Sequence, residues 1–245
     1  FKHGNFNVVL GHANTGKTTV ILYLMLMYSI KHKLKWLVFS SENEPYTLIK
    51  KLIEFMEGTV INKIEETHFK ERSEFINEHF KFIDPVKLYT YKDILELGQH
   101  VKDAWHYDGL LIDPYNSMTK DKQIAKTHNG HEYDYLACSE MRVFCKKNQI
   151  SIWLNTHAST DALRKRHSER HEYYGHPIHR YVQHPTEWMN SLIHVRKVKD
   201  VDTGGRPTSI DDPIRLRSVI NNVGFELNGK NLLDLPKRDQ INLPF

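Results

Sequence analysis

Eight residues near the start of the chain have the types and spacing of a phosphate-binding loop. The segment Gly11-His12-Ala13-Asn14-Thr15-Gly16-Lys17-Thr18 matches the pattern G-x-x-x-x-G-K-[ST] at every fixed position. In this pattern the glycines let backbone N–H groups surround a β-phosphate, the lysine reaches the β and γ oxygens, and the threonine hydroxyl can ligate Mg²⁺. We therefore expect a nucleoside triphosphate, taken to be ATP, to bind with Mg²⁺ at Gly11, Asn14, Thr15, Gly16, Lys17, Thr18 and Thr19.

The flanking residues predict the elements that this chemistry needs. Asn7–Leu10 has the pattern of a short buried strand, and Thr19–Met27 that of an apolar helix opening at the loop. The phosphate would then lie at a helix N-terminus, where free N–H groups and the helix dipole favour an anion. A chance glycine-rich turn is the alternative, and the strand before it and the helix after it argue against that interpretation.

Two carboxylates follow predicted strands and are candidates for the rest of a hydrolytic site. Asp113 ends the apolar run Gly109–Ile112, which is the pattern of an aspartate that holds the metal at the sheet edge. An ordinary strand-ending aspartate is the alternative. Glu42 follows Trp36–Ser41, where a carboxylate can act as general base towards an attacking water. Glu44 is its rival, and strand geometry alone does not separate the two.

A histidine completes the candidate set. His157 follows the run Ile152–Thr156, just past the end of a predicted strand. A polar side chain at that point can contact the γ-phosphate and report its loss to the segment beyond. A purely structural histidine is an equally weighted interpretation.

The hydrophobic pattern predicts an α/β fold with a mostly parallel sheet flanked by helices. Apolar runs predict strands at Asn7–Leu10, Trp36–Ser40, Phe80–Ile83, Gly109–Asp113 and Ser151–Asn155. Helical patterns cover about residues 17–31, 45–57, 91–105 and 132–147. Strands that alternate with helices form parallel sheets through right-handed crossovers.

The C-terminal part predicts an additional β region. Its strand-like segments, the first two separated by turn residues at Asp202–Pro207, are Leu192–Lys199, Ile214–Ile220 and Gly224–Leu227. Two long stretches, residues 116–131 and 159–187, have no assigned element, and loops of that length are usually functional or disordered. His167 and His171 in the second have a spacing that suits a metal, although no cysteine or HExxH pattern supports such a site.

Size and composition indicate one ordinary globular domain. The chain has 245 residues, 40% of them hydrophobic and 26% charged, and a net charge of +4 that is compatible with nucleic acid without requiring it. No apolar run approaches the roughly 18–20 residues of a membrane span. Cys138 and Cys145 share a predicted helix face at a spacing too long for a disulfide, which indicates buried thiols in a reducing compartment. Because the chain begins at Phe1, we expect residues 1–245 to be a single domain cut from a longer polypeptide.

Four landmarks occur in order: the phosphate loop, a strand ending in Ser-Ser-Glu42, a strand ending in Asp113, and a strand ending in Thr-His157. This series resembles the RecA-like ATPase core of DnaB-family replicative helicases, including bacteriophage primase-helicases and the Twinkle type. The resemblance implies a RecA-like P-loop NTPase fold and a replicative DNA helicase that translocates on single-stranded DNA. It also implies a homo-hexameric ring with ATP sites between subunits, in the cytoplasm of a bacterial or phage-infected cell.

The resemblance assigns roles to individual positions. Glu42 corresponds to the catalytic glutamate, Asp113 to the metal-binding aspartate, and His157 to the phosphate sensor. Arg196, which follows Ile193–Val195, is similar to an arginine that packs on the nucleotide base. Arg215 and Arg217 resemble the segment that enters the neighbouring subunit's site as an arginine finger, which stabilises charge on the transferred phosphoryl group.

The same resemblance gives the two long stretches a use, because in ring helicases such loops face the channel and hold single-stranded DNA. The candidate phosphate contacts are Lys120, Lys122, Lys126, Arg164, Lys165, Arg166 and Arg170. Charged loops that are merely solvated are the alternative. A primase or polymerase module in the same polypeptide is typical of phage relatives.

Two other functions remain open. A RecA/RadA-like recombination protein or a KaiC-like regulatory ATPase would use nucleotide to control assembly without unwinding DNA. A phosphotransferase of the P-loop kinase type is disfavoured, because no arginine-rich lid segment is evident and a catalytic Glu42 suits water as the acceptor.

Overall fold

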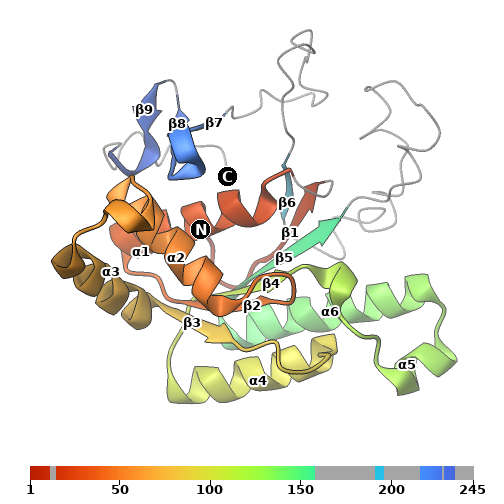
Figure 1. Cartoon of the computed structure of the whole chain (residues 1–245). Coiled ribbons are helices and arrows are strands. Elements are labelled where there is room, and N and C mark those ends of the chain that lie inside the picture. The colour runs from red at the N-terminus through yellow and green to blue at the C-terminus, as the bar shows by residue number, and fades with distance from the viewer. Residues whose placement is uncertain (12–14, 158–190, 196–215, 228, 235–245) are drawn as a thin grey trace, which may run out of the picture.

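A six-stranded parallel sheet forms the centre of the protein (Figure 1). The computed structural model describes residues 1–11, 15–157, 191–195, 216–227 and 229–234. Within these residues the strands of the sheet are β1 (Phe6–Gly11), β2 (Trp36–Ser40), β3 (Phe80–Ile83), β4 (Gly109–Asp113), β5 (Ser151–His157) and β6 (Ser191–His194). Their spatial order is β3-β2-β4-β5-β1-β6, which places the strand before the phosphate loop between β5 and β6.

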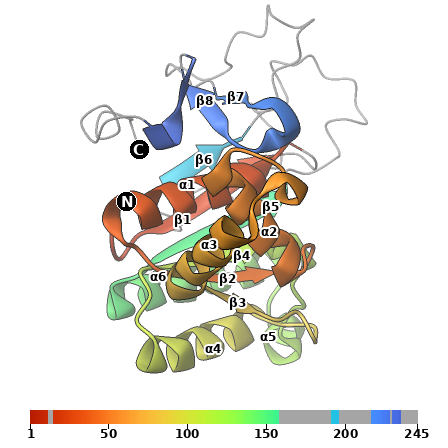
Figure 2. The same ribbon diagram turned by 60° about the vertical axis from the view of Figure 1, so that its left-hand side comes forward.

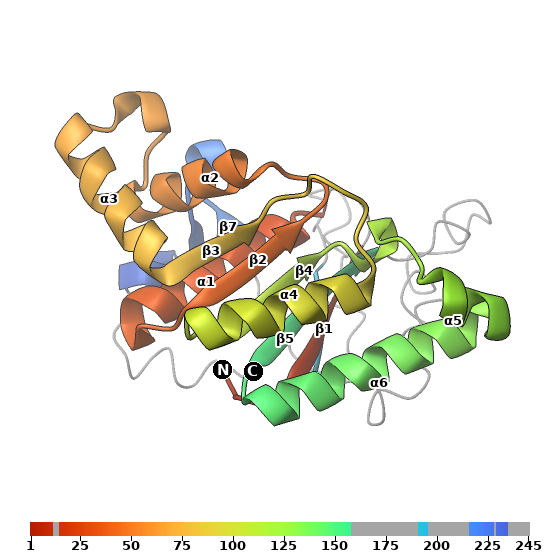
Figure 3. The same ribbon diagram turned by 90° about the horizontal axis from the view of Figure 1, so that it is seen from below.

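Helices cover both faces of this sheet (Figure 3). One face packs against α1 (Lys17–His32), α2 (Pro45–Glu57) and α3 (Glu66–His79). The other packs against α4 (Tyr91–Ala104), α5 (Lys122–Thr127) and α6 (Gly130–Asn148). Short 3-10 turns lie at η1 (Ile61–Lys63), η2 (Tyr115–Ser117), η4 (Ile220–Asn222) and η5 (Leu232–Asp234).

Alternation along the strands produces two cores. Val8 faces the α4–α6 side, and its neighbour Val9 faces the α1–α3 side; Leu37 and Val38 divide in the same way. Successive strand side chains point to opposite faces, so a strand buried on both sides is apolar at consecutive positions. The near-continuous apolar runs of the sequence have this physical cause.

The predicted strands and helices are largely confirmed. Strands β2, β3 and β4 and helix α2 have the expected bounds, and β5 continues two residues further, so that His157 is its last residue. Helix α3 was not predicted, because only Ile76 and His79 of its side chains are buried and the segment lacks an apolar stripe. The stretch 116–131 is also more regular than expected, since it contains part of η2, helix α5 capped by Asp121, and the start of α6.

The prediction for Leu192–Lys199 was partly wrong about its place in the fold. Its described residues form β6, which pairs in parallel with β1 and is an edge strand of the main sheet, not part of a separate β region. The separate region is a three-stranded antiparallel sheet of β7 (Arg217–Ser218), β8 (Phe225–Leu227) and β9 (Lys230–Asn231). It lies against α1, where the Tyr23 hydroxyl donates to Asn231 Oδ1 at 2.8 Å (Figure 2).

Two other expectations concern single features. Cys138 and Cys145 both lie on α6, both are buried and neither is in a disulfide, as predicted. Burial raises the pKa of each thiol to about 12, so both are unreactive thiols at neutral pH. Among the helices of the described residues, none is long and apolar enough to cross a bilayer.

Candidate functional site

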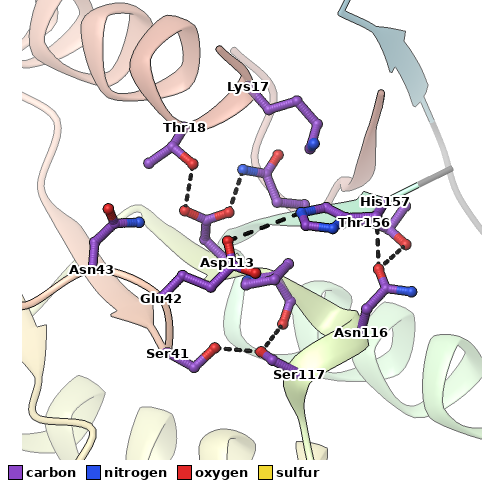
Figure 4. A network of polar contacts seen from close by, with 12 residues as sticks. Lys17, Thr18, Ser41, Glu42, Asn43, Asp113, Asn116, Ser117, Thr156 and His157 are labelled. Atoms are coloured by element: carbon purple, nitrogen blue, oxygen red, sulfur yellow. Dashed lines mark hydrogen bonds and ion pairs between the residues drawn. The ribbon is translucent and has the colours of Figure 1, made fainter. Parts of the chain in front are cut away.

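The strand register brings the candidate residues to the carboxyl-terminal edge of the sheet. Ser40 of β2 lies opposite Asp113 of β4, and Gly11 of β1 lies opposite His157 of β5. Glu42 follows β2 by two residues, so it projects from the same edge (Figure 4). Four parallel strands thus supply one site, as the topology of an open α/β sheet predicts.

The described part of the phosphate loop has a geometry that its glycines permit. Gly16 has a φ of 87°, a left-handed conformation that side chains disfavour, and it directly precedes α1. No side chain caps this helix start, and its first turn has no acidic residue, so the positive end of the helix dipole is left for an anion. At Gly11 a Cβ atom would lie 2.5 Å from the Val195 carbonyl oxygen. Neither position accommodates a larger residue without a shift.

Lys17 lies inside the loop, with 5% of its surface exposed. Its Nζ donates a hydrogen bond to the Gly11 carbonyl oxygen at 3.0 Å. Burial lowers the pKa of this ammonium group, and the nearby carboxylates of Asp113 and Glu42 oppose that shift. The cation is thus held at the point where a phosphate would neutralise it.

Asp113 is held by two hydrogen bonds from different elements. Its side chain is 2% exposed, Thr18 Oγ1 donates to Oδ2 at 2.8 Å, and Asn155 Nδ2 donates to Oδ1 at 2.6 Å. Burial raises the pKa of the carboxyl group, while the Asn155 and Thr18 hydrogen bonds act to lower it. The strand-ending aspartate is therefore joined directly to the threonine of the phosphate loop, as expected of a metal-binding pair.

Glu42 and His157 face each other across the edge of the sheet. His157 Nε2 lies 4.0 Å from Glu42 Oε2, and the Glu42 side chain is about half exposed at 49%. Burial and the charge of Lys17 lower the pKa of His157, with the two carboxylates opposing the shift, which favours a neutral imidazole at pH 7. Glu44, the rival carboxylate, directly precedes helix α2 and makes no side-chain cap. The geometry favours Glu42 for contact with the γ-phosphate.

The oxygen atoms around Asp113 fit Mg²⁺, which prefers oxygen ligands and retains several waters. The pair Thr18 Oγ1 and Asp113 Oδ2 supplies one hydroxyl and one carboxylate. Asn155 Oδ1, which is buried, has no hydrogen-bond partner among the described residues, so a polar acceptor there is available to a metal-bound water. Among the described residues there is no separate group of three or more His, Cys, Asp or Glu side chains that could hold a metal.

The structure adds residues that sequence reasoning missed. Asn155 holds Asp113, and Asn116 of η2 holds the end of β5, where its Oδ1 accepts from Thr156 Oγ1 at 2.8 Å and from the His157 N–H at 2.7 Å. Asn155 could have been found, because it is a buried amide two positions before His157 on the same strand face. Asn116 carried no such signal, since its partners lie about forty residues away along the chain.

Other predicted site residues are not brought into this cluster. Thr19 lines a cavity between α1 and α2 together with Thr18 and Asn43. Lys120 and Lys122 are exposed on the segment between η2 and the first turn of α5. Arg217 begins β7, where its backbone pairs with Glu226. Further predictions lie outside the described residues, namely Asn14, Arg164, Lys165, Arg166, His167, Arg170, His171, Arg196 and Arg215.

Similarity to known proteins appears in the structure and not in the sequence. No protein-family model matches the chain, and no curated protein matches its sequence. Among solved structures, the ATPase domain of another protein superposes with a TM-score of 0.57 at 14% identity, covering 75% of this chain and 67% of that one. A DnaB-like replicative helicase, solved in a study of its interactions with primase, gives a TM-score of 0.53 at 13% identity.

The coverage of that helicase is unequal, with 68% of this chain matching 42% of the other, so this chain spans less than half of its length. A KaiC-like protein, PH0186 from Pyrococcus horikoshii OT3, gives a TM-score of 0.45 at 16% identity, over 64% of this chain and 63% of that one. That score is too low to support an argument. The two higher scores, with the sheet order and the phosphate loop at the end of β1, show that the chain has the RecA-like fold of DnaB-type helicase ATPase domains.

Proposed function

We propose that this chain is the ATP-hydrolysing motor domain of a DnaB-type replicative helicase, acting on single-stranded DNA as a ring. One observation carries the hydrolytic part of this proposal. Asp113 is hydrogen-bonded to Thr18 of the phosphate loop and to Asn155 of β5, with Glu42 and His157 at the same edge of the sheet. A metal-binding carboxylate, a general base and a γ-phosphate contact are what transfer of a phosphoryl group to water requires.

Each residue has a distinct task in this reaction. Lys17 and the N-terminus of α1 bind the phosphates, and Thr18 and Asp113 would hold Mg²⁺, which neutralises charge on the β and γ oxygens. Glu42 accepts the proton of the attacking water as its oxygen bonds to the γ-phosphorus. The bond to the β–γ bridging oxygen breaks and ADP leaves with that electron pair. His157, neutral at pH 7, contacts the γ-phosphoryl oxygens and loses that contact when phosphate departs.

The translocating part of the proposal concerns residues beyond this cluster. Lys120 and Lys122 would contact the DNA backbone together with the basic residues Arg164, Lys165 and Arg166. Arg215 and Arg217 would complete a neighbouring subunit's ATP site, and Arg196 would pack on the base. What supports this arrangement is the fold shared with DnaB-like ATPase domains, and the exposure of Lys120 and Lys122 next to the site.

Three variants test the proposal. Lys17→Ala should abolish ATP binding, whereas Glu42→Gln should bind ATP normally and lose about 10²–10⁴-fold in turnover, because the general base is gone. Glu44→Gln is the matched control and should hydrolyse at the wild-type rate. ATP binding, steady-state ATPase with and without single-stranded DNA, and unwinding of a forked duplex are the measurements, made on the full-length protein.

The outcomes separate the alternatives. Unwinding that disappears in Glu42→Gln supports the motor. ATPase activity that ignores single-stranded DNA, without any unwinding by the wild type, would instead support a RecA/RadA-like or KaiC-like ATPase. Loss of turnover in Glu44→Gln with normal turnover in Glu42→Gln would reverse the assignment of the base.

A further inference from the structure

The turn η2 contacts both sides of the candidate hydrolytic site (Figure 4). On one side, Asn116 Oδ1 accepts two hydrogen bonds at the end of β5, from the Thr156 hydroxyl at 2.8 Å and from the His157 N–H at 2.7 Å. On the other side, the hydroxyl of Ser117 contacts the hydroxyl of Ser41, the residue before Glu42. Two adjacent residues therefore fix the backbone that carries the general base and the γ-phosphate contact.

The direction of the second contact follows from donor counting. Ser117 Oγ donates its proton to the Pro114 carbonyl oxygen at 2.9 Å, so Ser41 is the donor to Ser117. The Ser41 N–H in turn donates to the Asp113 carbonyl oxygen at 3.0 Å. The turn is thus bonded to the backbone on both sides of the metal-binding aspartate.

The same turn begins the segment 118–134, which carries Lys120 and Lys122. Tyr115 donates its hydroxyl proton to Asp134 Oδ1 of α6 at 2.8 Å, and the Thr119 N–H donates to the Tyr89 carbonyl oxygen at 2.9 Å. Beside the turn lies a cavity and not packed core; its lining includes Tyr91, Tyr115, Asn116, Lys120, Tyr133 and Asp134. Space next to the turn leaves room for it to shift together with the segment that follows.

We propose that η2 couples the hydrolytic site to the segment 118–134, with Asn116 as the positioning residue. A change at the γ-phosphate that moves the end of β5 displaces Asn116 through its two hydrogen bonds, and the displacement passes into the turn and helix α5. By linkage, a ligand on the segment 118–134 acts back on His157 to the same extent in free energy. The proposal rests on the proposed function only in taking that ligand to be single-stranded DNA.

A matched pair of substitutions isolates the acceptor atom. Asn116→Leu preserves the approximate shape of the side chain and removes the acceptor, whereas Asn116→Asp keeps an oxygen that accepts both hydrogen bonds. The first measurement is amide hydrogen exchange of peptides covering residues 115–134, with and without a non-hydrolysable ATP analogue. Wild type and Asn116→Asp should show exchange that depends on nucleotide, and Asn116→Leu should show none while still binding the analogue.

The second measurement is the affinity for fluorescein-labelled oligo-dT with the ATP analogue or with ADP. The ratio of the two affinities should fall to about one in Asn116→Leu and stay at the wild-type value in Asn116→Asp. A wild-type segment whose exchange ignores nucleotide, or an Asn116→Leu variant that behaves as wild type in exchange, overturns the inference. Nucleotide-dependent exchange in a wild type that binds no oligo-dT keeps the inference and overturns the proposed function instead.

Discussion

The carboxylate of Asp113 is buried, and burial by itself favours the protonated form and opposes binding of a cation. Hydrogen bonds from Asn155 and Thr18 counter that effect, and they come from two elements that meet only in the folded protein. The balance between burial and these donors sets the pH above which Asp113 can ligate Mg²⁺. Second residues that orient a metal ligand commonly tune its affinity for the metal in this way.

Asn155→Leu tests this balance. Without the donor, the already raised pKa of Asp113 should rise further, so that more of the carboxyl group is protonated at a given pH and the acid limb of the ATPase profile moves to higher pH. The free energy of unfolding should fall by about 1–3 kcal/mol, because a buried acceptor loses a partner. The pH dependence of turnover at saturating Mg²⁺ and urea unfolding are the measurements.

Asn7→Leu is the matched control for that substitution. Asn7 is also a buried strand asparagine, and its side chain donates to Ser151 Oγ at 2.8 Å near the opposite end of the sheet. It should lose a similar amount of stability and keep the wild-type pH profile. An acid limb that moves equally in both variants would mean that Asp113 is not the group being tuned.

Among the secondary-structure elements, the edge strand β6 has a specific relation to the phosphate loop. The Val195 N–H donates to the Leu10 carbonyl oxygen at 2.8 Å, and the Val195 carbonyl lies over Gly11. A glycine at the start of the loop thus serves two purposes. It begins the turn around the phosphate, and it lets a neighbouring backbone approach closely.

Gly11→Ala should therefore weaken the loop and the sheet edge together. The new Cβ would meet Val195 O at 2.5 Å and Thr15 Oγ1 at 2.9 Å, so backbone has to move. We expect ATP affinity to fall at least about tenfold and the unfolding free energy to fall by about 1–3 kcal/mol, the usual range for overpacking. Isothermal titration and chemical denaturation measure the two effects.

Gly130→Ala is the corresponding control, because its Cβ would meet only Lys120 Nζ, at an ordinary 3.5 Å. At the start of helix α6 it should leave stability unchanged or raise it slightly. Equal ATP affinity for Gly11→Ala and wild type would contradict the close approach of β6.

The elements that could be predicted are those whose burial leaves a periodic signal. Strands β2, β3 and β4 were predicted with their observed bounds, because strands buried on two faces are apolar without interruption. Helix α3 packs on the sheet through few side chains, so its sequence has the composition of a solvated surface. The place of β6 depends on pairing with β1, a long-range choice that local sequence does not encode.

The same contrast applies within the site. Lys17, Thr18 and Asp113 belong to motifs with fixed spacing, and the structure brings them together. Glu42 could not be separated from Glu44 until the path of the chain after β2 was known, because both follow the strand within a few residues. Asn116 acts through the backbone N–H of another strand, which has no sequence signature at all.

For the whole molecule, the proposed ring predicts ATP sites that two subunits share. Glu42 would act from one subunit, and Arg217 from its neighbour. Each of Glu42→Gln and Arg217→Ala should then be nearly inactive alone, with the loss of an arginine finger lowering turnover by about 10³-fold or more. Nucleotide affinity should stay near the wild-type value in both.

Mixing the two variants tests that arrangement. In an equal mixture, about a quarter of the interfaces would combine an intact Glu42 with an intact Arg217, if subunits assemble at random. Steady-state ATPase of the mixture should therefore exceed the sum of the separate variants by far. A mixture that is only as active as its components would place both residues in the same subunit's site, or remove Arg217 from the site altogether.

The order of strands has a consequence for synthesis of the protein on the ribosome. Strand β1 emerges first, yet its two neighbours in the sheet are β5 and β6, and Asn7 bonds to Ser151, 144 residues later. Until then the nascent chain carries an apolar strand with both edges unpaired, a template for association with other chains. Fragments that end before β5 should accordingly bind chaperones and no nucleotide, since the loop that follows β1 is anchored only when translation is well advanced.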